Sequence, residues 1–131
     1  METFRGEVIQ ESLANPDILS RFTILSTRIS VVTPEHKTPW LQQWTLHTIE
    51  VPADRAEKMA TDLSHALDVL HCGSWYVDFK SSSLHYVIYP GRVFQIDRRD
   101  PEQYRKATEY GISIGIPAQQ VDFEPSILKA I

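Results

Sequence analysis

Three short runs of strand-forming residues, each separated from the next by a few residues, constrain this chain more than any other feature. They are residues 74–80, 84–89 and 92–97. Strands joined by such short turns pair antiparallel. The loop Ser81-Ser82-Ser83 is expected to span three residues, and Tyr89-Pro90-Gly91-Arg92 fits a type II turn with glycine at positive φ. The sequence therefore predicts an antiparallel meander.

The rest of the chain adds strands and helices in the order β-α-β-β-α-β-β-β-α. The other strands are expected at 4–12, 24–32 and 44–51, and the helices at 16–22, 56–70 and from Pro101 to about Gly115. A competing interpretation of the last segment makes residues 112–114 a strand. The pattern favours one α+β domain over residues 1–131, with a mainly antiparallel sheet and helices packed on one face. A ferredoxin-like unit in part of the chain is compatible with this order.

The central helix carries the clearest periodicity, with apolar residues at helical spacing along one stripe. Asp54 and Glu57 stand three residues apart at its start, in the manner of a capping box. The stripe consists of Ala56, Met59, Ala60, Leu63, Leu67 and Leu70. We expect this stripe to be buried against the sheet.

Composition excludes several classes of protein. The 131 residues are 42% hydrophobic and 23% charged, with a net charge of −4 and a single cysteine, Cys72. Scattered basic residues disfavour nucleic-acid binding, and no apolar run is long enough to span a membrane. The first residues lack the pattern of a signal peptide. We expect a cytoplasmic protein without disulfide bonds.

The turn assignments also predict which side chains share a face of the meander. A three-residue loop places Tyr76 opposite Ile88, and the following turn places Ile88 opposite Val93 and Tyr86 opposite Gln95. One face then carries an apolar row of Tyr76, Tyr86, Ile88 and Val93. Three alternatives for what covers this apolar row remain: the chain's own loops or its C-terminal tail, a second copy of the chain, or a ligand. A one-residue slip in either turn would change this assignment.

Metal and nucleophile motifs are absent. The five histidines lack ligand spacing, and Cys72 has no CxxC partner, so we predict neither a metal nor a cofactor. His47 and His85 lie on apolar strand faces, where a histidine is either a hydrogen-bonded core residue or a general acid-base. The predicted register turns Asp78 and His85 to opposite faces, which argues against a direct pair.

Aromatic residues gather near the proline-containing loop and the meander. Together with a histidine and an arginine, they could stack a planar ligand and hold an anion. These candidate ligand-binding residues are Trp40, Trp44, His47, Trp75 and Arg92. The alternative is that Trp44 and Trp75 are simply core residues.

Two stretches resemble a group of small single-domain bacterial proteins of uncharacterised function. They are HKTPWLQQWTLHTIEV, and the run from WYVDFK through YGISIGIPAQQVDF. The resemblance covers most of the chain beyond Pro34. It implies a natural stand-alone domain and carries no reaction or catalytic residue.

Three functions follow as hypotheses. The first is a non-enzymatic binding or interaction module, a homodimer with a small-molecule pocket near the proline loop. The second is a small enzyme that uses His47 or His85 as general acid-base. The third is a regulator that docks on a partner protein through Tyr76, Ile88 and Val93.

Overall fold

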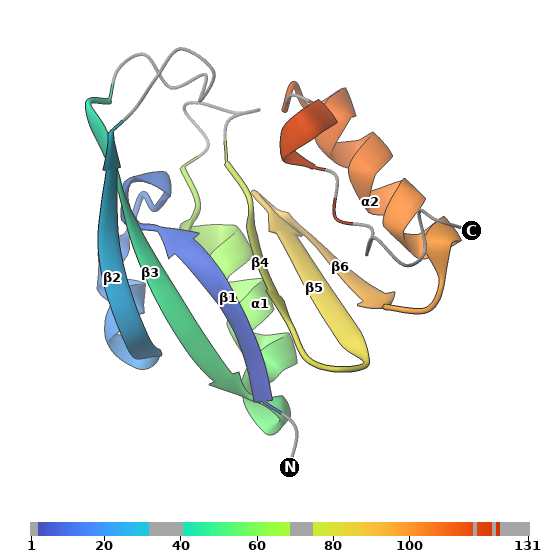
Figure 1. Cartoon of the computed structure of the whole chain (residues 1–131), viewed down its shortest axis with the longest axis horizontal. Helices are drawn as coiled ribbons and strands as arrows, with labels where there is room; N and C mark the ends of the chain where they lie inside the picture. The colour runs from blue at the N-terminus through green and yellow to red at the C-terminus, as the bar shows by residue number, and fades with distance from the viewer. Residues whose placement is uncertain (1–2, 32–40, 69–74, 117, 122, 124–131) are drawn as a thin grey trace.

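A six-stranded antiparallel sheet forms the centre of the molecule (Figure 1). The computed structural model describes residues 3–31, 41–68, 75–116, 118–121 and 123. The strands are β1 (Thr3–Ile9), β2 (Thr23–Val31), β3 (Gln43–Pro52), β4 (Val77–Lys80), β5 (Leu84–Tyr89) and β6 (Arg92–Asp97). The helices are α1 (Ala56–Ala66) and α2 (Pro101–Ser113), with short 3₁₀ turns η1 (Gln10–Ser12), η2 (Pro16–Arg21), η4 (Ala53–Arg55) and η5 (Ala118–Gln120). The predicted α+β class is confirmed.

The strand order β2-β3-β1-β4-β5-β6 places the first strand in the middle of the sheet. β1 pairs antiparallel with both β3 and β4, so β3 and β4 run parallel to each other on its two sides. α1 connects these two parallel strands. This split β-α-β unit is the feature that the fold shares with ferredoxin-like proteins.

The two helices pack on opposite faces of the sheet, because alternate residues of one strand enter different cores. On β5, Tyr86 and Ile88 belong to the core that α1 covers, whereas Val87 and Tyr89 belong to the core that α2 covers. The expectation of helices on one face therefore holds for η2 and α1, which share one core, and is wrong for α2, which packs on the other face. The term "α1 face" is used below for the first side of the sheet and "α2 face" for the second.

α1 buries the predicted apolar stripe, although its ends differ from the prediction. Ala56, Met59, Ala60 and Leu63 are buried. The Asp54 capping box does not form, because the chain first makes the η4 turn and the helix then begins without a side-chain cap. The helix also ends early: Leu67 is buried but extended, and it forms a bridge to Leu13.

α2 follows its sequence signals closely. The Asp100 carboxylate accepts a hydrogen bond from the Glu102 amide at 3.0 Å, and Pro101 occupies the first turn. Gly115 has a φ of 105°, and the chain turns back so that the Ile116 amide donates to Gly111 O at 3.0 Å. The helix interpretation of residues 112–113 is confirmed and the competing strand is wrong. Among the described helices, none is long and apolar enough to cross a membrane.

Candidate functional site

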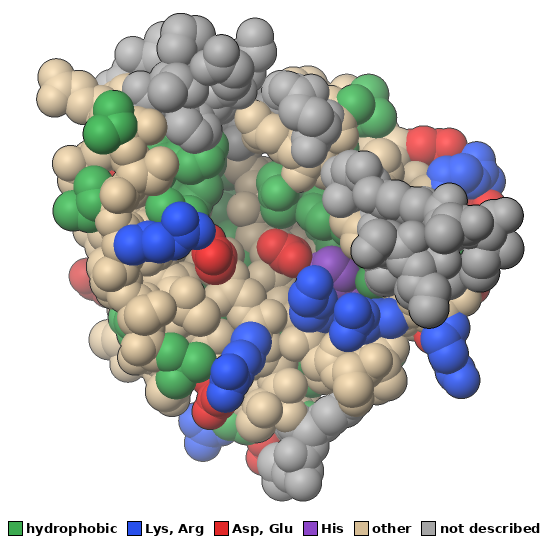
Figure 2. Space-filling model, viewed as in Figure 1, with side chains coloured by type: hydrophobic (Ala, Val, Ile, Leu, Met, Phe, Trp, Pro, Cys, Tyr) green, Lys and Arg blue, Asp and Glu red, His purple; other side chains and the backbone are tan. Residues whose placement is uncertain are grey.

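The described helices cover the α2 face only in part. α2 packs over β5 and β6, while no described helix lies over this side of β2, β3, β1 and β4 (Figure 1). Figure 2 shows this side, with hydrophobic side chains in a hollow at its upper centre and acidic and basic side chains across its middle. We call this area, over which no described helix lies, the open face.

A carboxylate and a buried histidine meet where the open face borders α2. Lys80 lies directly opposite His85 in the β4–β5 ladder, so Asp78, two residues before Lys80, is a diagonal neighbour of His85 on the same side. Asp78 Oδ2 lies 2.7 Å from His85 Nε2. The histidine side chain is 3% exposed and the aspartate side chain 31% exposed. The pair thus presents a surface carboxylate that a buried ring supports.

Tyr104 of α2 completes this network from behind. Its hydroxyl lies 3.1 Å from His85 Nδ1, and the two rings meet edge to face with centroids 5.6 Å apart. With Nε2–H donating to Asp78, Nδ1 of a neutral imidazole accepts the proton of the Tyr104 hydroxyl. Burial raises the pKa of Tyr104, while the neighbouring Arg98 acts against this shift. The phenol therefore keeps its proton and remains a donor.

A second carboxylate stands beside Asp78. Glu7 lies directly opposite Asp78 in the β1–β4 ladder, and like charges in such a position repel each other. Arg28 of β2 donates from Nη2 to both Glu7 oxygens, at 3.1 Å each. A row of polar and charged side chains thus crosses the open face from β2 to β5. In this row Arg28 is the partner of Glu7, and His85 is the partner of Asp78.

Aromatic rings border the carboxylates. Tyr76 and Phe123 meet edge to face with centroids 5.1 Å apart, and Phe123 also lies 5.9 Å from the His85 ring. Burial raises the pKa of Tyr76, and the charges of Asp78 and Glu7 raise it further. A neutral phenol and a phenyl ring therefore flank the acidic pair, which makes this part of the open face apolar at its edge.

The prediction that Asp78 and His85 point to opposite faces is wrong, and the cause is one turn. The Ser81 amide donates to Leu84 O at 2.8 Å, and the Ser81 hydroxyl accepts the Leu84 amide at 3.1 Å. Ser81 therefore belongs to the ladder, and the loop is Ser82-Ser83 rather than three residues. The β4–β5 register thus differs by one residue from the predicted register, so every β4 side chain lies on the opposite face from the one predicted relative to β5.

The same slip removes the predicted apolar row. Tyr86 and Ile88 are buried in the core under α1, and Val93 packs against that core. Tyr76 lies on the other side, against Tyr89 and Phe123. The four residues do not form a shared exposed surface, so the premise of an interface built from them is wrong.

The five predicted ligand-binding residues are only partly brought together. Trp44 and Trp75 are neighbours, with ring centroids 5.8 Å apart, and Trp75 is buried. Arg92 lies over the rings of Phe94 and Tyr110, and β1, β4 and β5 separate its strand from that of Trp44. Trp40 lies outside the described residues.

His47 is held by hydrogen bonds on both ring nitrogens. Thr27 Oγ1 lies 2.8 Å from Nδ1, and Gln10 Oε1 lies 2.8 Å from Nε2. The ring is buried and is directly opposite Val8, on the α1 face. This geometry is that of a core histidine whose two ring nitrogens both have hydrogen-bond partners.

Sequence reasoning did not identify Glu7, Arg28 or Tyr104 as site residues. Tyr104 was recognisable as an inward-facing residue of a capped helix, but its partner was not. Glu7 and Asp78 are 71 positions apart, and only the insertion of β1 beside β4 brings them together. Within the described part of the chain, no three His, Cys, Asp or Glu side chains are grouped closely enough to hold a metal ion.

Comparisons with protein-family models, with curated protein sequences and with solved structures gave no significant match.

Proposed function

We propose that this protein is a binding module that holds a small ligand on the open face, with Asp78 as the anchoring group. The observation that carries this proposal is the 2.7 Å contact between Asp78 Oδ2 and His85 Nε2. A carboxylate fixed by a buried ring loses little conformational freedom when a ligand binds. Such preorganised polar groups orient ligands in otherwise apolar sites.

The surroundings of Asp78 indicate the chemistry of the ligand. Glu7 lies beside Asp78 on the adjacent strand, where its charge is paired with Arg28, and the Tyr76 and Phe123 rings border the two carboxylates. A cationic head group would be attracted by the Asp78 carboxylate and by the faces of the rings. We infer a small ligand with a protonated amine and an apolar body.

The test compares probes of one shape and different charge. 2-Phenylethylamine, 2-phenylethanol and 3-phenylpropionate are titrated into the protein, and binding is followed by NMR shifts of the amides near Asp78. The amine should bind at least about ten times more tightly than the other two. Asp78→Asn should remove this preference, while Glu50→Gln, an acid-to-amide change elsewhere on the sheet, should keep it. Equal affinity for amine and carboxylate would contradict the proposal.

We also propose that the module is a homodimer joined through β2, an edge strand of nine residues. Ile29 is 63% exposed and Val31 75% exposed, although both are large apolar residues. A long, apolar, unpaired edge is a template for pairing with another strand. The bulge between Ile24 and Ser26 limits the regular segment to the second half of β2.

A two-fold axis at Ile29 suits this segment. It sets Ile29 against its own copy, Thr27 against Val31, and Arg28 against Ser30, so that no like charges meet. The test is the molar mass in solution at about 100 µM. Wild type should be dimeric and Ile29→Lys monomeric, while Ile112→Lys, which changes an exposed isoleucine of α2, should stay dimeric. A monomeric wild type would refute the dimer and leave the ligand site untouched.

A second function, general acid-base catalysis, is favoured by one observation. Asp78, His85 and Tyr104 form a connected chain that ends at a surface carboxylate. In this case Asp78 would contact the substrate and His85 would position it. Turnover of 4-nitrophenyl acetate that falls to background in both Asp78→Asn and His85→Gln would favour the enzyme. Equal rates in wild type and both variants would exclude it for this ester.

A further inference from the structure

A hollow on the side of α1 is lined mainly by cations. It has a volume of about 310 Å³ and is lined by Arg21, Arg55, Lys58 and Met59. Arg21 comes from the end of η2, Arg55 from η4, and the other two from the first turn of α1. Three positive side chains in one hollow are unexpected in a chain whose net charge is −4.

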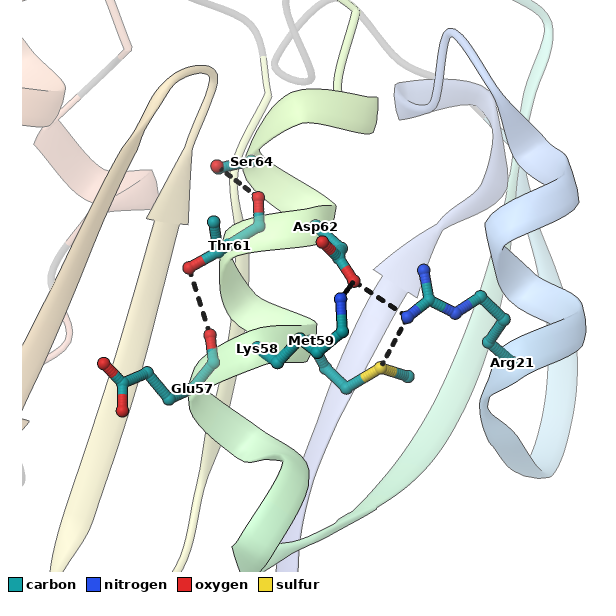
Figure 3. Close-up of polar contacts among 7 residues, drawn as sticks. All are labelled: Arg21, Glu57, Lys58, Met59, Thr61, Asp62 and Ser64. Atoms are coloured by element: carbon teal, nitrogen blue, oxygen red, sulfur yellow. Dashed lines mark hydrogen bonds and ion pairs between the residues drawn. The ribbon is translucent and has the colours of Figure 1, made fainter.

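The carboxylates around this hollow do not balance its charge. Arg21 Nη2 and Lys58 Nζ share a single oxygen, Asp62 Oδ2, at 2.8 Å and 3.2 Å (Figure 3). Among the described residues, Arg55 has no ion pair. Glu57 points away from Arg21 in Figure 3, and its charge adds to the effect of burial in raising the pKa of Tyr86. The hollow therefore keeps a net positive charge.

The position of two of these cations also costs stability. Arg55 is the N-cap residue of α1, and Lys58 is its third residue. The N-terminal end of a helix carries a positive partial charge, so that cations there are unfavourable and anions favourable. No side chain caps this helix end. An anion in the hollow would interact favourably with the helix end and with the cations.

Arg21 is arranged to bind such an anion. Met59 Sδ and Asp62 Oδ2 lie 3.7 Å and 2.8 Å from Arg21 Nη2, and they fix the guanidinium against α1. Within the part of the chain that is described, all its hydrogen bonds leave from Nη2. Nε and Nη1, on different edges of the guanidinium, thus each keep N–H groups that can donate to an anion.

We propose that this hollow binds the phosphate group of a small molecule, through Arg21, Arg55 and Lys58. The site is separate from the open face and does not depend on the function proposed for it. Its volume exceeds that of a phosphate ion and lies at the lower end for small-molecule sites. The phosphate is therefore either free or carried by a small phosphorylated compound.

The experiment titrates inorganic phosphate and ribose 5-phosphate into the folded protein at constant ionic strength in chloride buffer. Binding is followed by NMR shifts of the Lys58 and Met59 amides. Saturable binding in the millimolar range or tighter is expected. Tighter binding of the ester would identify a phosphorylated small molecule, and equal binding would identify free phosphate. Both results uphold the site.

Variants decide whether the hollow itself is responsible. Arg55→Gln and Lys58→Gln should each weaken phosphate binding at least about ten-fold, and circular dichroism would verify that both are folded. Lys106→Gln removes one exposed cation from α2 and should change the affinity less than two-fold. The proposal is wrong if phosphate causes no saturable shifts. It is equally wrong if Lys106→Gln weakens binding as much as Arg55→Gln does.

Discussion

His85 Nε2 and Asp78 Oδ2 are 2.7 Å apart, with the imidazole buried and the carboxylate at the surface. This contact ties β4 to β5 through side chains as well as through the ladder. Because the Tyr104 hydroxyl holds the other ring nitrogen, the same contact also links the sheet to α2. Removal of the Asp78 carboxylate would leave the buried Nε2 of His85 without its hydrogen bond.

The first prediction concerns this contact. Asp78→Asn keeps the shape of the side chain but removes the charge, so that the free energy of unfolding should fall by about 1–3 kcal/mol. Urea denaturation of wild type and variant measures this change. Glu50→Gln is the control, because the partner of Glu50 is the exposed Arg5 rather than a buried ring, and this ion pair should contribute about 1 kcal/mol or less. Equal losses in both variants would mean that burial of His85 adds nothing to the pair.

Gly6 provides the second prediction. A Cβ at this position would lie 1.9 Å from Asp78 O and 2.7 Å from Phe79 Cα, both backbone atoms of the neighbouring strand. β1 and β4 would have to separate, so Gly6→Ala should lower the free energy of unfolding by about 3 kcal/mol or more.

The comparison for Gly6 is Gly91→Ala in the β5–β6 turn. Gly91 has a φ of 73° and no atom within 4 Å of an added Cβ, so only backbone strain of about 1–2 kcal/mol is expected. Thermal or urea denaturation of both variants tests whether Gly6→Ala is the more destabilising of the two substitutions. A Gly6→Ala protein as stable as Gly91→Ala would show that β1 and β4 are not so closely packed.

The third prediction tests the α1 core. Leu63 is fully buried in the core that α1 covers, and Leu63→Ala should cost about 2–5 kcal/mol of stability. Thr61→Ala, an exposed change on the same helix, should cost about 0.5 kcal/mol or less. A loss below about 0.5 kcal/mol for Leu63→Ala, measured by urea denaturation, would be inconsistent with a core position.

The fourth prediction concerns alkaline pH. Burial raises the pKa of Tyr76, Tyr86, Tyr89 and Tyr104 above the usual 10.0. The unfolded chain therefore releases these protons first as the pH rises. The four buried, protonated phenols therefore stabilise the folded state fully below pH 10, and this contribution to the free energy of unfolding is lost as the pH rises above 10.

The melting temperature between pH 8 and pH 11 measures this effect. It should fall steeply above pH 10, and it should fall less steeply in Tyr76→Phe, which lacks one of the four phenols. A melting temperature that is the same at pH 8 and pH 10.5 would contradict the raised pKa values.

The sequence predicted those elements that short-range chemistry determines. Asp100 and Pro101 begin α2 and Gly115 ends it, because capping and glycine geometry act within a few residues. The stripe from Ala56 to Leu63 identified the buried side of α1. The Pro90-Gly91 turn fixed the β5–β6 register for the same reason, and the predicted pairing of Ile88 with Val93 is confirmed.

The tertiary structure alone decided the features that depend on residues far apart in the chain. No local signal places β1 between β3 and β4, so the Glu7–Asp78 neighbourhood was invisible in the sequence. The β4–β5 register depended on whether Ser81 is paired or looped, and neighbouring serines do not distinguish the two. Because side chains alternate along a strand, this single residue decided whether Asp78 faces away from His85 or binds it.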